Sequence, residues 1–257
     1  AATAALMIYA GDSMPTPVLM ILMFVASLAA GMIWGIIPAI FKAYFNTNET
    51  LFTLMLNYVA MQIVTFCIVY WENPAGSNTV GIINSATRAG WLPALGGLTY
   101  GWNVLIVLAF TFGMYIYMKY SKQGYEVAVV GESQDTARYA RINVKRTIIR
   151  TMGISGGICG IAGFLLVSGA SHTISTSTAG GRGFTAIIVA WLSKFNAFVM
   201  ILVSFFLVFM EKGAIQIASQ FNLNENASDV ITGIILFFIL GSEFFIRYRI
   251  AFTKAHK

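Results

Sequence analysis

The residue types that usually carry catalysis are few in this chain and widely spaced. Its two histidines are His172 and His256, and its two cysteines are Cys67 and Cys159. None of them has the spacing of a metal-ligand motif. Surface histidines, and cysteines packed as small apolar residues, account for all four without any chemistry. The sequence therefore predicts no catalytic residue, no metal site and no enzyme.

A glycine-rich stretch raises the possibility of phosphate chemistry. Gly180, Gly181 and Gly183 surround Arg182, but a phosphate-binding loop of this kind also needs a Lys followed by Ser or Thr. We therefore interpret the stretch as a tight turn in front of a broken helix. No cofactor is expected on this chain, and any ATP would be bound by a partner subunit.

The composition places these residues in a membrane protein. Hydrophobic residues make up 58% of the 257 residues and charged residues only 10%, whereas soluble domains carry roughly 25% charged residues. This excludes an ordinary soluble enzyme, a disordered chain and a secreted disulfide scaffold. The expected fold is an all-α integral membrane protein, a polytopic helix bundle.

Apolar stretches of about 20 residues can cross a bilayer as helices. The chain predicts about six such crossings, one of them short or broken, plus the end of a truncated helix at 1–10. The first residue is Ala rather than Met, so we expect further helices before it. The long apolar stretches are 18–41, 51–71, 102–118, 151–170, 195–210 and 230–246.

Basic residues mark the cytoplasmic side of a membrane protein. The stretch 119–150 holds seven of the sixteen Lys and Arg residues, the tail after 246 holds four, and 72–101 holds only Arg88. We therefore predict a cytoplasmic 119–150 loop, a cytoplasmic C-terminus and an external 72–101 loop. The net charge of +6 is then a topology signal, and nucleic acid is not an expected partner.

The predicted orientation requires the chain to cross back between 170 and 195. Only 175–192 is available, and it is half polar and half apolar. We predict a short or broken helix there, with a re-entrant loop as the alternative. Irregular backbone at membrane depth must be surrounded by protein or by a water-filled cavity, so this segment is expected near a pathway.

Two features inside the apolar stretches could mark either a pathway or helix packing. Asn57 and Gln62 lie in the middle of 51–71, where each needs a hydrogen-bond partner. Glycines fall at helical spacing along 151–170 and include two GxxxG pairs, which let helix backbones approach closely in lipid. The residues of these two features are Asn57, Gln62, Gly153, Gly156, Gly157, Gly160 and Gly163, and Gly183 of the 175–192 segment is predicted to serve the pathway or helix packing as well.

The predicted cytoplasmic loop contains one amphipathic stretch, 133–148. A polar face would hold Gln134, Arg138, Arg141 and Lys145, an apolar face Ala137, Ala140, Val144 and Ile148, with Ser133 as the cap. Such a helix could lie on anionic lipid or dock into a groove of a cytosolic partner. The composition does not decide between these two interpretations.

Several motifs resemble one family. GESQDTARYARIN at 131–143 resembles the cytoplasmic coupling segment of bacterial ABC-importer permeases for branched-chain amino acids, ribose-like sugars and nucleosides. The nucleoside and simple-sugar subfamily is the most similar. Its resemblance lies in GIIPAIFKAYFNTNE at 35–49, TLMLNYVA at 53–60, ISGGICGIAG at 154–163 and GFTAIIVA at 183–190.

The resemblance implies a permease subunit without its own ATPase. The chain would form one permease domain over 1–257, with 119–150 as its coupling loop. Two such chains, identical or homologous, would pair in a bacterial cell membrane, in contact with lipid, around a pathway for nucleosides or related sugars. An external binding protein would deliver the substrate. A cytosolic ATP-binding subunit would receive the 133–142 helix. The alternative is a stand-alone carrier or channel for a small polar solute.

The family resemblance also assigns residues to the ATPase contact, and this chain departs from the family pattern there. The expected contact residues are Gly131, Ala137, Arg138, Tyr139, Ala140 and Ile142. Arg141 stands where the family usually has glycine, so the resemblance predicts an altered contact around that position.

Overall fold

The computed structural model describes residues 1–11, 13–74, 76–97, 99–176 and 178–221, together with positions 230, 233, 234, 237, 238, 241 and 242. Every secondary-structure element of this part is a helix, which confirms the all-α prediction. The elements are α1 (Ala2–Ala10), α2 (Thr16–Phe45), α3 (Glu49–Tyr70), α4 (Gly101–Tyr120), α5 (Lys122–Glu132), α6 (Gln134–Tyr139), α7 (Val144–Leu166), the π-helix η1 (Val167–Ser171), α8 (Arg182–Leu192) and α9 (Ala197–Gln220).

Five helices of the described part are long and apolar enough to cross a membrane: α2, α3, α4, α7 with η1, and α9. They coincide with five of the predicted crossings. The shorter apolar helix α8 falls inside the stretch predicted to be short or broken. The predicted crossing at 230–246 and the tail after it lie outside the described residues, apart from the positions named above.

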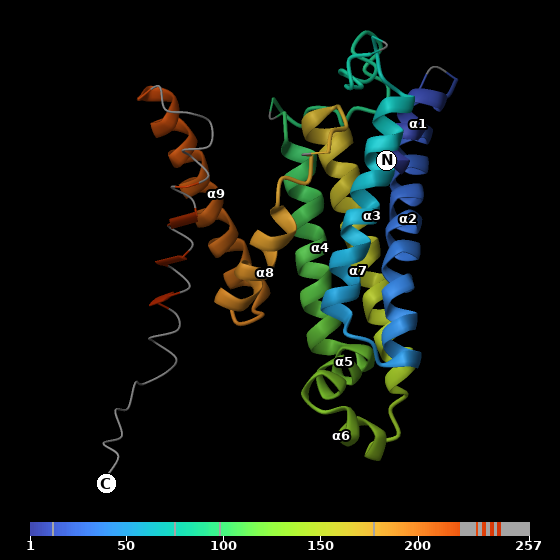
Figure 1. Ribbon diagram of the computed structural model, residues 1–257, viewed down its shortest axis with the longest axis vertical. Coiled ribbons are helices and arrows are strands. Elements are labelled where there is room, and N and C mark those ends of the chain that lie inside the picture. Colours follow the sequence, from blue (N-terminus) through green and yellow to red (C-terminus); the bar gives the residue numbers. More distant parts are fainter. Residues whose placement is uncertain are drawn as a thin grey trace. The chain divides into compact units, whose positions relative to one another are not determined.

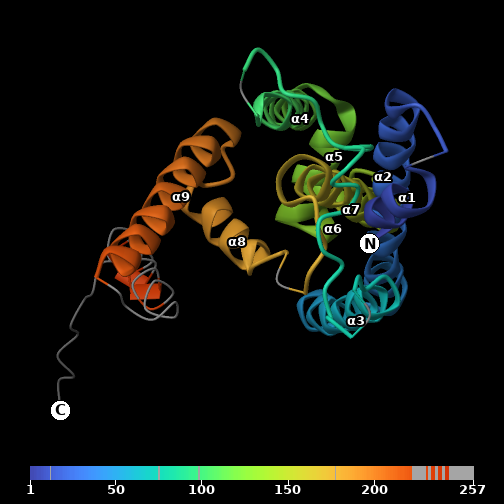
Figure 2. The same cartoon turned by 90° about the horizontal axis from the view of Figure 1, so that it is seen from above.

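The chain divides into two compact units, Ala1–Thr178 and Ala179–Lys257. In the first unit, α2, α3, α4 and α7 run along a common direction with α7 between the others (Figures 1 and 2). The loop between α3 and α4 lies at one end of these helices, and α5 and α6 lie at the opposite end (Figure 1). The two loops predicted to face opposite sides of a membrane are therefore at opposite ends of the bundle.

Local sequence explains how α2 gives way to α3 within three residues. Asn46 ends α2 in a left-handed conformation, with φ of 49°, and its N–H donates to the carbonyl of Lys42. Asn48 then caps α3, because its side chain accepts from the N–H groups of Thr50 and Leu51. Asn is favoured in both roles, so this pair of asparagines produces a tight turn.

The closest helix contact in the first unit joins α2 and α7 through glycines on both helices. A Cβ on Gly160 would overlap the carbonyl oxygen of Ser27, and one on Gly156 would overlap that of Gly31. A Cβ on Gly35 would lie 2.7 Å from the carbonyl oxygen of Met152. Only glycine permits this separation, which brings many backbone atoms of the two helices into van der Waals contact.

The buried apolar core of the first unit lies toward the end that carries the α3–α4 loop. Met7 of α1, Met23 of α2 and Phe164 of α7 belong to it, as do Val80 and Ile83 of the loop. Trp91 packs against this core and donates its indole N–H to the carbonyl of Ile83 at 3.0 Å. The loop is therefore a packed part of the unit rather than a loose connection.

The second unit begins with the glycine turn. Gly180 and Gly181 both have positive φ, of 51° and 70°, and α8 starts directly after them at Arg182. Positive φ is the conformation that glycine adopts without strain, so the predicted tight turn before a short helix is confirmed. Asn196 caps α9 through bonds from the N–H groups of Phe198 and Val199.

The α2–α7 contact generates a matched pair of substitutions on one helix. Gly160→Ala should lower the free energy of unfolding by about 1–3 kcal/mol, because the added methyl forces two tightly packed backbones apart. Gly163→Ala is the control, since its Cβ would meet nothing within 4 Å, and it should be neutral or stabilise by up to about 1 kcal/mol. Thermal unfolding of the purified protein in detergent measures both, and equal effects would contradict the contact.

Candidate functional site

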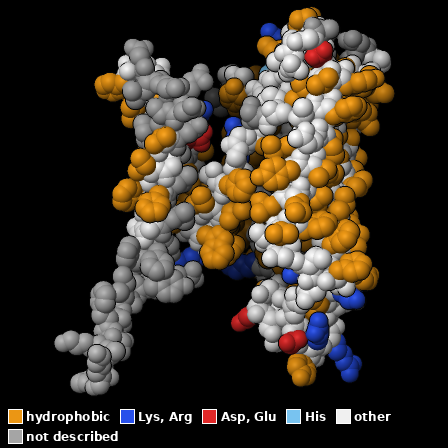
Figure 3. Space-filling model, in the orientation of Figure 1, with side chains coloured by type: hydrophobic (Ala, Val, Ile, Leu, Met, Phe, Trp, Pro, Cys, Tyr) orange, Lys and Arg blue, Asp and Glu red, His pale blue; other side chains and the backbone are white. Residues whose placement is uncertain are grey.

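The first candidate site is the loop that joins α4 to α7. Its helices α5 and α6 lie beyond the end of the long helices (Figure 1). Apolar side chains cover the middle of the first unit, and charged side chains gather around α5 and α6 (Figure 3). This change from apolar to charged surface is what a segment in water at the end of membrane-spanning helices requires.

The structure corrects the predicted 133–148 helix. The chain forms the six-residue α6, and α7 begins separately at Val144. Arg141 between them is left-handed, with φ of 57°, and Asn143 caps α7 by accepting from the N–H of Arg146 at 3.1 Å. The cap at Asn143 and the reversal at Arg141 outweigh the amphipathic pattern, so Val144 and Ile148 belong to α7.

The predicted contact residues are distributed unevenly over the surface of this loop. Ala137 is fully buried within the chain, and its carbonyl accepts from the N–H of Ile142 at 2.9 Å. Tyr139 is 91% exposed, and Arg138 and Ala140 are also exposed. Gly131 is exposed in the last turn of α5. Of the predicted contact residues on α6 and directly after it, Arg138, Tyr139 and Ala140 are therefore the exposed ones.

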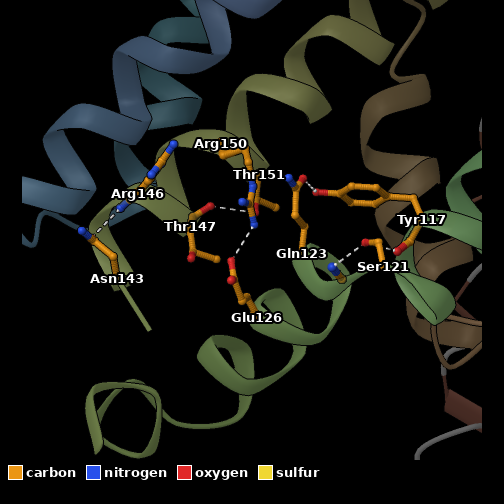
Figure 4. A network of polar contacts seen from close by, with 10 residues as sticks. Tyr117, Ser121, Gln123, Glu126, Asn143, Arg146, Thr147, Arg150 and Thr151 are labelled. Atoms are coloured by element: carbon orange, nitrogen blue, oxygen red, sulfur yellow. Dashed lines mark hydrogen bonds and ion pairs between the residues drawn. The ribbon is translucent and has the colours of Figure 1, made fainter. Parts of the chain in front are cut away.

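Polar contacts attach this loop to the long helices (Figure 4). Tyr117 at the end of α4 donates its hydroxyl proton to Gln123 in the first turn of α5 at 3.1 Å. Ser121 caps α5 by accepting from the N–H of Gly124 at 2.9 Å. On the other side, Arg150 of α7 pairs with Glu126 of α5 at 3.1 Å. The first helix of the loop, α5, is therefore attached to both α4 and α7.

The second candidate site is a pocket of about 620 Å³ between α2, α3 and α7. Thr53 and Asn57 line it from α3, Ser155 and Cys159 from α7, and Trp34 from α2. None of the side chains that line it in the described structure is charged. A mostly apolar pocket of this size with a few polar groups suits an uncharged small molecule.

The predicted pathway or packing residues fall in different places. Asn57, Gly156 and Gly160 line the pocket, and the two glycines also form the α2–α7 contact. Gln62 is exposed on α3 and does not line that pocket, and Gly163 faces open space. Gly183 lies in the first turn of α8, in the second unit.

His172 does not stand free at the surface, contrary to the simplest interpretation of the sequence. Its ring stacks on that of Trp91, with centroids 3.8 Å apart and planes 10° apart, and partial burial lowers its pKa. Its carbonyl accepts from the N–H of Ile83 at 2.9 Å, and Ser168 of η1 donates to the carbonyl of Gly90. These contacts fasten the α3–α4 loop to the end of α7.

The amino-acid sequence matches one known protein family. The family described as the permease component of the branched-chain amino acid transport system matches residues 1–240. The chain belongs to this family. The match covers both candidate sites, and it confirms the resemblance deduced from the motifs, the assignment to a multi-pass membrane permease and the exclusion of an enzyme.

Three known permease proteins are similar to this chain in sequence. A glucose ABC transporter permease protein of Haloferax volcanii is 28% identical over 93% of this permease and 65% of its own length. A guanosine ABC transporter permease protein of Bacillus subtilis is 28% identical, over 86% and 64%. A nucleoside ABC transporter permease protein of Lactococcus lactis is 26% identical, over 92% and 67%. The chain thus spans about two thirds of their length. No solved structure matches it significantly.

Two parts of the site were not found from the sequence. The α2 half of the glycine contact carries its own signal, because Gly31 and Gly35 form a GxxxG pair. The Glu126–Arg150 pair has no local signal, since its members are 24 residues apart on separate helices.

The reversal between α6 and α7 predicts an effect of the backbone at one position. A left-handed conformation costs a residue other than glycine roughly 1–2 kcal/mol. Glycine avoids this cost but makes the unfolded chain more flexible, which offsets part of the gain. Arg141→Gly should therefore give a more stable permease than Arg141→Ala by about 1 kcal/mol. Both variants remove the same side chain, and thermal unfolding compares them. An alanine variant as stable as the glycine variant would contradict the left-handed conformation.

Proposed function

We propose that this permease is the membrane subunit of an ATP-driven importer for nucleosides or related simple sugars. A cytosolic ATP-binding subunit would dock on α6, a second identical or homologous permease chain would complete the pathway, and an external binding protein would deliver the solute. The 119–150 loop and the C-terminus would be cytoplasmic, in one permease domain over 1–257. The family and the names of the relatives support the class of transporter.

The observation that carries the ATPase contact is the form of α6. Ser133 caps this helix, accepting from the N–H of Thr136 at 3.3 Å, and α5, which precedes it, is attached to both α4 and α7. Tyr139 projects from it with 91% of its surface exposed. An exposed tyrosine on a short, held helix is the kind of residue that anchors a protein interface.

The substrate class rests on the pocket between α2, α3 and α7. Its described side chains are uncharged, and Asn57 offers both donors and acceptors. Sugars and nucleosides are uncharged and rich in hydroxyl groups, so they match such a lining better than an amino acid zwitterion does. The glucose, guanosine and nucleoside permeases among the relatives support the same choice.

The docking proposal predicts the effect of Tyr139→Glu. Placing a carboxylate at the centre of the interface should weaken binding of the ATP-binding subunit by about 2 kcal/mol or more, roughly thirtyfold in Kd. Tyr125→Glu is the control, because Tyr125 is 65% exposed in the same loop but lies on α5. Co-purification of the ATPase with the full-length permease measures both. Retention of the ATPase by the Tyr139 variant, with normal uptake, would exclude α6 as the docking site.

The pathway proposal predicts that Asn57→Leu impairs transport in an assembled complex. Losing one hydrogen bond to the solute should cost about 1–1.5 kcal/mol, so uptake by the reconstituted transporter should fall about tenfold. Gln62→Leu is the control, because it removes an amide from the same helix outside the pocket. If Asn57→Leu instead prevents assembly, its amide serves helix packing and not the pathway.

A further inference from the structure

One ion pair connects the loop that carries α6 to the helix that lines the pocket. Glu126 of α5 and Arg150 of α7 lie 3.1 Å apart, and their side chains are only 22% and 25% exposed. The pair closes a ring of chain that contains α6 and both of its connections. Because the ring is closed, a force applied to α6 reaches α7 through Arg150 as well as through the covalent chain.

The other ion pairs of the described residues are different in kind. Asp135 and Arg138 are three residues apart within α6, with side chains 82% and 67% exposed. Lys42 and Glu49 are 3.8 Å apart, across the α2–α3 turn. Exposed pairs such as Asp135–Arg138 contribute little, at most about 1 kcal/mol. Glu126–Arg150 is the most buried of the three and the one that joins the loop to α7.

A partly buried pair of this kind is better suited to positioning than to raising stability. The cost of removing two charges from water offsets most of their attraction. The planar guanidinium nevertheless fixes direction as well as distance. Arg150 uses its Nη2 on Glu126, and its buried Nε has no hydrogen-bond partner among the described residues, so a two-point contact with the same carboxylate is also available.

The position of Arg150 along α7 determines what the pair can move. Gly156 lies six residues further on and is part of both the α2–α7 contact and the pocket wall. At 1.5 Å per residue this separation is about 9 Å along the axis of an unbroken α-helix. A displacement of Arg150 therefore reaches the pocket wall with no flexible segment between them.

We infer that Glu126 and Arg150 are the positioning pair that makes the loop and α7 move as one body, so that closure of the ATPase against α6 shifts the pocket wall. The inference rests on the proposed function. It assigns to these two residues the transmission of movement, and not contact with the ATPase or the solute. Without the pair, ATP hydrolysis continues while its link to uptake is lost.

The test measures uptake per ATP hydrolysed by the complete transporter, with the full-length permease, in lipid vesicles. Glu126→Gln and Arg150→Gln should each lower this ratio about fivefold or more, the usual lower size of a coupling between sites, while the ATPase stays bound. The double variant Glu126→Gln/Arg150→Gln should stay uncoupled although it buries no unpaired charge. Glu49→Gln, which removes the carboxylate of the α2–α3 pair, should leave the ratio unchanged.

The contrary results distinguish failure of this inference from failure of the proposed function. Wild-type ratios in both single variants, with the ATPase bound, overturn the inference alone. A wild-type ratio in the double variant also overturns it, because the pair would then serve only to avoid an unpaired buried charge. An unmodified permease that retains no ATPase overturns the proposed function and the inference with it.

Discussion

The close approach of α2 and α7 is the contact on which the rest of the first unit depends. In lipid, apolar side chains gain little by leaving the hydrocarbon, so close backbone packing must hold helices together. Gly31 and Gly35 on α2 and Gly156 and Gly160 on α7 provide that packing. By contrast, no residue of α4 is buried and most of α3 is exposed. The fixed pair α2–α7 is therefore the frame to which the pocket and the loop are attached.

Features that depend on neighbouring residues could be predicted from the sequence. Hydropathy located all five described crossings, because an apolar run is a local property of the sequence. It did not give all of their ends, since α7 begins seven residues before the predicted 151 and α9 ends ten residues after the predicted 210. The cap at Asn48 and the glycine turn before α8 were predictable for the same reason. The basic character of 119–150 placed that loop at the end opposite to 72–101, as the structure has it, because charge that cannot enter lipid must collect beyond the helix ends.

Two kinds of feature could not be predicted: those in which local signals favour different structures, and those that depend on residues far apart in the sequence. The 133–148 pattern fitted one amphipathic helix, but the cap at Asn143 and the left-handed Arg141 divide it, and amphipathicity contains no information about either. Burial of Ala137 follows from packing within the loop, which no periodicity reveals. The Glu126–Arg150 pair needs two helices brought together by the fold. The parts of the site that were missed are thus its tertiary contacts, while its location was predictable.

The uncharged pocket and the loop that carries α6 are connected by one helix, α7. Carriers that use an ion gradient commonly have ionisable side chains at membrane depth, and the described pocket lining includes no Asp, Glu, Lys, Arg or His. In the proposed importer, the free energy for transport comes from ATP on a partner subunit and so enters from outside the pocket. Helix α7 would be the route, because it contacts α5 at Arg150 and lines the pocket at Gly156. An uncharged pocket is compatible with that proposal, since the proposed route needs no charge in the pocket.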